Sequence, residues 1–277
     1  MSALISTEAL RAVLGEPGLV VIDASWYMPA DKQDARANFA ATHVPGARFF
    51  DLDAASDQAS LLPHMLPGAK DFAASMAVLG VSNASRVVVY DQLGLFSAAR
   101  LWWMLRVFGH EQVLILDGGL PGWMAAGFAT EAGAAAVAPG AFTAVYRPEL
   151  VRSGDEVLAN IATKTAVVLD ARGAPRFKGA VPEPRPGLRA GHMPGARNLP
   201  FGELLVGGKL RAGAELRAKF AALGVSGDQN VIASCGSGVT ACIIALALHE
   251  AGLNEAAVYD GSWAEWGARA ELPVETG

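Results

Sequence analysis

A cysteine followed by a glycine-rich turn is the feature of this sequence best suited to covalent chemistry. Cys235 ends a short apolar run and begins the sequence CGSGVT, which leads into an amphipathic segment from about Thr240. We expect Gly236 and Gly238 to allow positive φ angles, so that successive backbone N–H groups point at the sulfur. The N-terminus of the following helix would add partial positive charge. Both effects favour thiolate over thiol and predict a nucleophilic Cys235.

The same turn would stabilise a second sulfur atom attached to Cys235, because a persulfide carries its negative charge on the outer sulfur. The alternative is a buried structural cysteine, which the strand-turn-helix context disfavours. Cys242, the other cysteine, lies among Ala and Ile residues and is interpreted as a core residue. Two cysteines are too few for a disulfide framework or a zinc site. We therefore predict thiol chemistry at Cys235 that needs no metal and no organic cofactor.

Composition excludes several classes of protein. The 277 residues are 52% hydrophobic and 18% charged, which excludes a disordered or fibrous chain. Lys and Arg number 22 against 27 Asp and Glu, so the basic excess that nucleic-acid binding needs is missing. No apolar stretch approaches the roughly 20 residues of a membrane span, and Glu8 stands where a secretory signal would be apolar. We expect a cytoplasmic protein with no nucleic-acid or membrane partner.

The first half of the sequence recurs in the second. A chain of this length is compatible with one large domain or with two ordinary ones, and the recurrence favours two. The matching segments keep their order, which chance similarity would not produce. They are VIDA at 21–24 with VLDA at 168–171, HVPGAR at 43–48 with HMPGAR at 192–197, LGVS at 79–82 and again at 223–226, VVVYD at 87–91 with VIASC at 231–235, and Asp117 and Trp123 with Asp260 and Trp266.

This repeat predicts an N-terminal domain over 1–130, a linker over 131–148, rich in Ala and Gly at its start, and a C-terminal domain over 149–277. Asp91 stands in the first copy at the position of Cys235. A carboxylate cannot serve as a sulfur nucleophile, so only the C-terminal domain is predicted to be catalytic.

Each copy alternates short β-branched runs with longer helical patterns, which is typical of an α/β fold around a mainly parallel sheet flanked by helices. Strands are predicted at 19–23, 87–90, 113–116, 167–169, 231–234 and 256–259. Helices are predicted at 6–14, 95–108, 214–223 and 240–251, with Gly109 and Gly252 as C-terminal stops. Ser153 and Glu156 form a capping box that begins a further helix.

The chain resembles the two-domain rhodanese family of sulfurtransferases over nearly its full length. Within that family it is most similar to the 3-mercaptopyruvate sulfurtransferases. The segments that carry the resemblance are DASWYMP from Asp23, HVPGARFFDLD from His43, HMLPGA from His64, FSAARLWWMLRVFGH from Phe96, RFKGAVPEPRPG from Arg176, GHMPGAR from Gly191 and CGSGVTAC from Cys235.

The resemblance implies two tandem rhodanese-like domains, of which only the second carries a persulfide cysteine in a six-residue loop. It places the substrate carboxylate on Arg176 and Arg185, and the sulfur within the loop formed by Gly236, Gly238, Val239 and Thr240. Ser237 is assigned a catalytic role in the same loop, in which its hydroxyl polarises the substrate carbonyl or the sulfur. Thiosulfate-specific relatives have cationic side chains after the cysteine, whereas mercaptopyruvate-type relatives have Gly-Ser-Gly, as here. Physical reasoning agrees, because a small dianion needs charged donors beside the sulfur, and a guanidinium fork fits a more distant carboxylate.

Relatives of this kind complete the site with a histidine and an aspartate, which match His64 and Asp53. A His beside an Asp is able to orient a substrate and transfer protons at neutral pH; the alternative is that both are ordinary loop residues. His43 and His192 occur in both copies and are interpreted as structural. The six tryptophans are interpreted as core or interface residues, with Trp263 and Trp266 as possible neighbours of the site: Trp26, Trp102, Trp103, Trp123, Trp263 and Trp266.

The predicted reaction moves sulfur from 3-mercaptopyruvate through a Cys235 persulfide to cyanide or to a thiol, such as that of a thioredoxin-like protein. Thiosulfate:cyanide sulfurtransferase activity is the main alternative, and a non-catalytic sulfur-carrier module is another. A cysteine phosphatase is disfavoured, because its phosphate-binding arginine would stand at position 241, which is alanine.

Overall fold

The chain divides into two compact units in the computed structural model, which describes residues 2–133, 137–227 and 229–277. Unit 1 comprises residues 1–58, 67–147 and 207–210, and unit 2 comprises residues 59–66, 148–206 and 211–277. Part of the predicted linker, residues 134–136, lies outside the described residues. None of the helices within the described ranges is long and apolar enough to cross a membrane.

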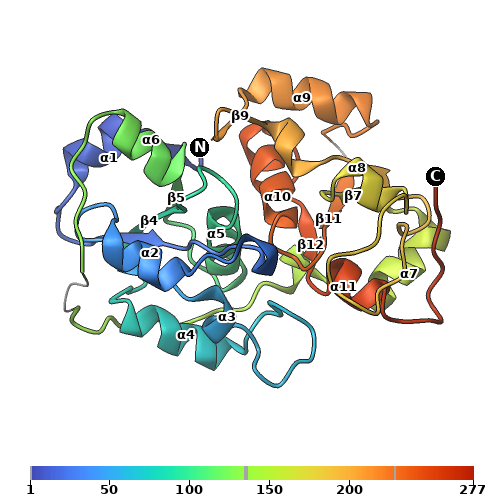
Figure 1. The fold of residues 1–277 in the computed structure, drawn as a ribbon, viewed down its shortest axis with the longest axis horizontal. Coiled ribbons are helices and arrows are strands. Elements are labelled where there is room, and N and C mark those ends of the chain that lie inside the picture. Colours follow the sequence, from blue (N-terminus) through green and yellow to red (C-terminus); the bar gives the residue numbers. More distant parts are fainter. Residues whose placement is uncertain (1, 134–136, 228) are drawn as a thin grey trace. The chain divides into compact units, whose positions relative to one another are not determined.

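Unit 1 contains a five-stranded parallel sheet in the order β1-β5-β4-β2-β3. Helix α5 packs against β4 and β5 (Figure 1). The strands are β1 (Leu4–Ile5), β2 (Leu19–Asp23), β3 (Arg48–Phe49), β4 (Arg86–Tyr90) and β5 (Val113–Leu116). The helices are α1 (Thr7–Val13), η1 (Pro29–Asp31), α2 (Ala35–Ala41), α3 (Leu52–Ala55), α4 (Ala69–Val78), α5 (Ala98–Val107) and α6 (Gly119–Ala125).

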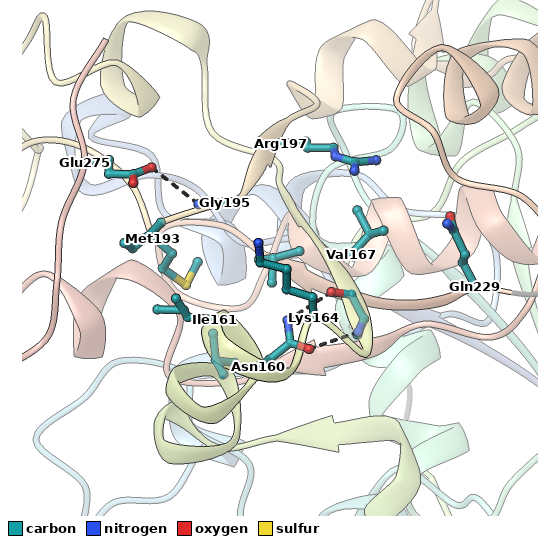
Figure 2. A pocket seen from close by; sticks show the side chains of 13 residues that line it. Asn160, Ile161, Lys164, Val167, Met193, Gly195, Arg197, Gln229 and Glu275 are labelled. Atoms are coloured by element: carbon teal, nitrogen blue, oxygen red, sulfur yellow. Dashed lines mark hydrogen bonds between the residues drawn. The ribbon is translucent and has the colours of Figure 1, made fainter.

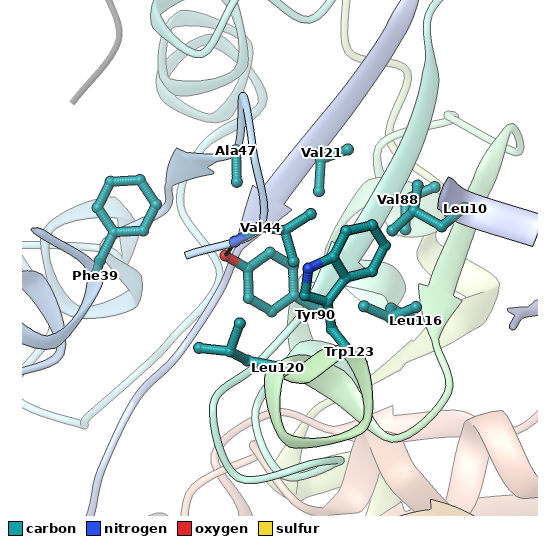
Figure 3. Packing of buried hydrophobic residues seen from close by; sticks show 10 residues of the cluster. All are labelled: Leu10, Val21, Phe39, Val44, Ala47, Val88, Tyr90, Leu116, Leu120 and Trp123. Atoms are coloured by element: carbon teal, nitrogen blue, oxygen red, sulfur yellow. Dashed lines mark hydrogen bonds between the residues drawn. The ribbon is translucent and has the colours of Figure 1, made fainter. Parts of the chain in front are cut away.

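A cluster of buried apolar side chains fills one side of this sheet. The Tyr90 ring lies in the middle of the cluster (Figure 3), and its hydroxyl accepts a hydrogen bond from the Val44 N–H at 3.2 Å. Burial raises the pKa of Tyr90 far above its usual value, so the hydroxyl stays neutral. The members of the cluster are Leu10, Val21, Phe39, Val44, Ala47, Val88, Tyr90, Leu116, Leu120 and Trp123.

Unit 2 repeats the topology, with a parallel sheet in the order β6-β12-β11-β7-β8. Its strands are β6 (Val151–Arg152), β7 (Ala166–Asp170), β8 (Arg197–Asn198), β11 (Asn230–Ser234) and β12 (Ala257–Tyr259). The helices are η2 (Pro148–Leu150), α7 (Gly154–Thr163), α8 (Ala174–Phe177), η3 (Phe201–Leu204), α9 (Gly213–Ala222), α10 (Ala241–Glu250) and α11 (Ser262–Trp266). Two short strands, β9 (Leu205–Val206) and β10 (Lys209–Leu210), lie between η3 and α9 along the chain.

The local signals in the sequence mark most element boundaries correctly, and the α/β class is confirmed. All six predicted strands are present, each within one residue of its predicted bounds. The capping box of α7 forms, with the Ser153 N–H donating to Glu156 at 2.8 Å. Helices α5 and α10 end before Gly109 and Gly252, which adopt φ angles of 84° and 68°.

Helix α5 begins later than its sequence pattern predicts. The pattern predicts a helix from Leu95, but the structure begins it at Ala98. The N–H groups of Phe96 and Ser97 donate instead to the carboxylate of Asp91, at 2.7 and 2.9 Å. These residues therefore belong to the loop between β4 and α5, because the side chain of the first residue of that loop binds their amides.

The two repeated histidines make equivalent contacts in their own units. His43 Nδ1 lies 2.8 Å from the Phe39 carbonyl oxygen, and the two rings stack with centroids 4.2 Å apart. His192 Nδ1 lies 2.8 Å from the Phe177 carbonyl oxygen and stacks on that ring at 3.9 Å. Such contacts fix the backbone around each histidine, as expected of structural residues.

Candidate active site

Cys235 lies directly after the carboxyl end of β11, a central strand of the unit 2 sheet. This end of a parallel sheet is where open α/β folds place their ligands. The cysteine is 2% exposed, and its backbone is held from both sides. Its N–H donates to Ser262 Oγ at 3.1 Å, and its carbonyl oxygen accepts from the Trp263 N–H at 3.0 Å. The start of α11 therefore fixes the position of the nucleophile.

The two glycines of the cysteine loop have different roles. Gly238 adopts a φ of 76°, as predicted, whereas Gly236 does not adopt a positive φ, and that part of the prediction is wrong. A Cβ on Gly236 would lie 3.1 Å from an Nη atom of Arg176. The missing side chain of Gly236 thus leaves room for the Arg176 guanidinium beside the loop, and a Cβ there would displace the guanidinium slightly.

The loop leads into α10, whose buried face carries the second cysteine. The helix begins at Ala241 after Thr240, and the Thr240 side chain makes no capping bond. Val239 is 2% exposed, and Cys242 is fully buried. The Cys242 thiol donates to the Gly238 carbonyl oxygen at 3.2 Å. Cys242 therefore packs as a core residue beneath the loop.

The equivalent loop of unit 1 shows how this junction treats a negative charge. Asp91 is fully buried, and its Oδ2 accepts the N–H groups of Phe96, Ser97 and Ala98 at 2.7, 2.9 and 2.9 Å. Its Oδ1 accepts the Leu93 N–H at 2.9 Å. A strand-loop-helix junction of this fold therefore surrounds the first loop residue with backbone donors, which is a suitable environment for an anion.

Ser237 and His64 lie together, although the sequence separates them widely. The Ser237 hydroxyl oxygen is 3.0 Å from His64 Nδ1, and both residues are buried. His64 has a φ of 61°, an uncommon value for a residue other than glycine. Its segment is also fixed by the Leu66 N–H, which donates to Asp260 at 2.7 Å. The pair forms a pre-arranged hydroxyl and imidazole beside Cys235.

Asp53, the predicted third member of this group, belongs to unit 1. Its carboxylate accepts a hydrogen bond from Trp26 Nε1 at 3.1 Å, and Trp26 stacks on Phe96 with ring centroids 6.2 Å apart. His64 belongs to unit 2. The partnership of Asp53 with His64 therefore stays a prediction.

Charged side chains surround the loop on the side of Gly236. Arg176 pairs with Glu183, which also accepts from Arg172 Nη1 at 2.8 Å. Arg172 in turn pairs with Asp170 at 2.7 Å and lies over the Trp263 ring at 4.1 Å. Arg185 follows Glu183 closely along the chain and is partly exposed. The resemblance assigned Arg176 and Arg185 to the substrate carboxylate, which stays a prediction, and gave no role to Glu183 or Arg172.

A cavity of about 620 Å³ lies elsewhere in unit 2. Figure 2 shows its lining, with Asn160 and Lys164 from the end of α7, Val167 from β7, and Gln229, which precedes β11. These positions mark the amino end of the parallel strands, whereas Cys235 follows their carboxyl end. The cavity is therefore separate from the site of the predicted chemistry.

Comparison with known proteins decides the family. The model of the rhodanese-like domain matches residues 6–126 and again residues 153–269. The chain belongs to the rhodanese family. It is 46% identical to the 3-mercaptopyruvate sulfurtransferase of Escherichia coli over 98% of this chain and 97% of that protein. It is 43% identical to the thiosulfate sulfurtransferase of Bos taurus over 99% of this chain and 94% of that protein.

A solved structure agrees with this rhodanese assignment. The crystal structure of SseA from E. coli, described as a 3-mercaptopyruvate sulfotransferase, superimposes with a TM-score of 0.88 at 42% identity. The match covers 95% of this chain and 99% of that one. The prediction of two rhodanese-like domains with mainly parallel sheets is therefore confirmed.

Proposed function

We propose that this rhodanese is a sulfurtransferase that takes sulfur from 3-mercaptopyruvate, forms a persulfide on Cys235 and releases pyruvate. The observation that carries the proposal is the position of Cys235, which follows β11 in a loop contacted by Arg176 on one side and containing Ser237 beside His64. The relatives named as 3-mercaptopyruvate sulfurtransferases, at 42–46% identity, support the same donor.

The first half-reaction transfers one sulfur atom. The Cys235 thiolate attacks the sulfur of mercaptopyruvate, and the bond between that sulfur and carbon breaks. The bonding electrons remain on carbon, which gives the enolate of pyruvate, and one proton converts the enolate to pyruvate. Ser237 and His64, 3.0 Å apart, are suited to polarise the carbonyl group and to supply that proton. Cys235 is left as a persulfide.

The second half-reaction returns the enzyme to its starting state. A thiolate or cyanide attacks the outer sulfur of the persulfide, and the bond between the two sulfurs breaks to give the Cys235 thiolate again. The loop supports both states, because the unit 1 equivalent binds a carboxylate through four N–H groups. A thioredoxin-like protein would supply a suitable acceptor thiol, and a cytoplasmic location, supported by the composition, belongs to the same proposal.

Thiosulfate is the second candidate donor. It is supported by the bovine relative named as a thiosulfate sulfurtransferase, at 43% identity. The loop residues at 236–238 offer one hydroxyl and no cationic side chain, which favours mercaptopyruvate, since a small dianion gains most from charged donors beside its sulfur.

Intact-mass spectrometry tests the proposal directly. The wild-type protein should gain the mass of one sulfur atom after addition of mercaptopyruvate and lose it again after addition of cyanide. Cys235→Ser should show no gain and no pyruvate release. Cys242→Ser is the matched control, because it removes the other, fully buried thiol and should leave the mass gain intact. Pyruvate release by Cys235→Ser at the wild-type rate would refute the mechanism.

The substrate carboxylate is assigned to Arg176 and Arg185 in this proposal. Arg185→Lys keeps the positive charge but loses the planar fork that binds a carboxylate through two N–H groups. We expect the KM for mercaptopyruvate to rise roughly tenfold, the loss of about one hydrogen bond, while kcat changes less. An unchanged KM would remove Arg185 from the carboxylate site.

A further inference from the structure

Four charged side chains form a continuous chain of alternating sign in unit 2. It runs from Asp170 through Arg172 and Glu183 to Arg176. The first three side chains are at most 1% exposed, whereas Arg176 is 26% exposed. Its charges sum to zero, so burial of the group leaves no uncompensated charge.

Of these four residues, Glu183 is the one that contacts both arginines. Its Oε1 accepts from Arg172 at 2.8 Å, and its Oε2 accepts from Arg176 Nε at 3.2 Å. Arg172 has other partners, since its Nη2 also donates to the Gly191 carbonyl oxygen at 2.9 Å. Asp170 and Arg172 are thus held in place by several contacts, and Glu183 links Arg176 to them.

The far end of Arg176 is what reaches the cysteine loop. An Nη atom lies 3.1 Å from the position that a Cβ on Gly236 would occupy. The guanidinium therefore borders the residue next to Cys235, and the same Nη atom that lies nearest Gly236 also pairs with Glu183. Any donor whose negative charge enters the loop meets Arg176 together with the carboxylate that offsets it.

We propose that Glu183 is a specificity-determining residue, which orients Arg176 at the loop and offsets its charge so that a monoanionic donor is preferred to a dianionic one. The inference rests on the proposed sulfurtransferase activity. Mercaptopyruvate carries one negative charge on a carboxylate remote from its sulfur. Thiosulfate carries two beside its sulfur, so the charge of Glu183 acts more strongly against it.

Two variants separate orientation from charge. Glu183→Gln keeps the size of the side chain but removes its charge, and Arg172 keeps Asp170 and Gly191 as partners. We expect the ratio of kcat/KM for thiosulfate to kcat/KM for mercaptopyruvate to rise about tenfold, with little dependence on salt because the Glu183 side chain is buried and buried charges are screened much less than exposed ones. Glu183→Asp keeps the charge but shortens the reach to Arg176, so the KM for mercaptopyruvate should rise severalfold while the ratio changes little.

The matched control is Glu203→Gln, which removes a glutamate from an exposed ion pair with Lys219 in the same unit. It should leave both donors unaffected. A merely structural role of Glu183 would lower both activities together and leave the donor ratio unchanged, and that result in Glu183→Gln would overturn the inference. A Glu183→Asp variant with wild-type KM would equally overturn it. Absence of a persulfide on the wild-type protein with either donor would instead overturn the proposed function.

Discussion

Removal of the Asp91 carboxylate should strongly destabilise unit 1, although this residue performs no sulfur chemistry. The side chain is fully buried and accepts four backbone N–H groups at 2.7 to 2.9 Å. Asp91→Ala leaves these donors without their acceptor in the loop that begins α5. Asp91→Asn keeps the shape of the side chain and one acceptor oxygen. The difference in unfolding free energy between the two variants therefore reports the loss of the side-chain volume and of the bonds that the Asn oxygen keeps.

The expected size follows from the geometry. A hydrogen bond to a charged group contributes about 1.5–3 kcal/mol, and water entering the emptied loop would recover part of the loss. We therefore expect Asp91→Ala to lower the free energy of unfolding by about 3–5 kcal/mol, at the upper end of single-substitution effects. In Asp91→Asn the amide oxygen can take the three N–H groups bound by Oδ2, and its NH2 group then faces the Leu93 N–H. That single repulsive contact should cost about 1–2 kcal/mol.

Urea unfolding followed by circular dichroism and tryptophan fluorescence measures both changes. Asp71→Ala, which removes an exposed aspartate from the same unit, is the control and should change the free energy by less than about 0.5 kcal/mol. An Asp91→Ala protein within about 1 kcal/mol of wild type would refute the hydrogen-bond argument. If Asp91→Ala and Asp91→Asn lower the free energy of unfolding equally, the assignment of three N–H groups to Oδ2 and one to Oδ1 does not account for stability.

Three further predictions concern local structure. Ser262→Gly should slow persulfide formation on Cys235 severalfold in stopped-flow assays, because the Cys235 N–H loses its bond to the Ser262 hydroxyl. The urea midpoint should change little, because glycine adopts a φ of 48° without the strain that serine has there and this offsets the lost bond. Burial lowers the pKa of His110 below its usual 6.5, so the histidine is protonated in the unfolded chain before it is protonated in the folded one as pH falls. The free energy of unfolding should therefore fall as pH drops below 6.5, and His110→Asn should reduce this pH dependence in urea titrations. Ser153→Ala should lower the free energy of unfolding by about 1 kcal/mol in the same titrations, because α7 loses its capping box with Glu156.

The fold was largely predictable from the sequence because its signals are local. Runs such as Val87–Tyr90 and Val231–Ser234 are apolar, β-branched and bounded by turn residues, and each forms a buried strand. The start of α5 was not predictable in the same way. Residues 95–97 continue a helical pattern, but the amides of Phe96 and Ser97 bind Asp91, and a pattern of apolar residues carries no information about which side-chain acceptor a backbone N–H will find.

The site was predictable where its chemistry depends on residue type, and not where it depends on space. A reactive cysteine in a glycine loop and a nearby serine can be found from CGSGVT alone. The reason for Gly236 is different: it makes room for Arg176, which lies on helix α8. Glu183 had a visible signal, since it stands between Arg176 and Arg185, but only the structure shows that it contacts two guanidinium groups.

The loops that begin at Asp91 in unit 1 and at Cys235 in unit 2 share one backbone contact and differ in the residue beside it. The same bond closes both loops, from the Leu120 N–H to the Asp91 carbonyl oxygen and from the Trp263 N–H to the Cys235 carbonyl oxygen, each at 3.0 Å. Before these donors stand Gly119 in unit 1 and Ser262 in unit 2, with φ angles of 55° and 48°.

A serine in this conformation is strained by about 1–2 kcal/mol relative to glycine. Its hydroxyl, however, accepts the Cys235 N–H and donates to the Tyr259 carbonyl oxygen at 2.8 Å, which offsets the strain and fixes the nucleophile. In unit 1 the loop binds the protein's own Asp91 carboxylate and needs no such support. In unit 2 the loop begins with Cys235 instead, and the Ser262 hydroxyl supplies the bond that holds this residue in place.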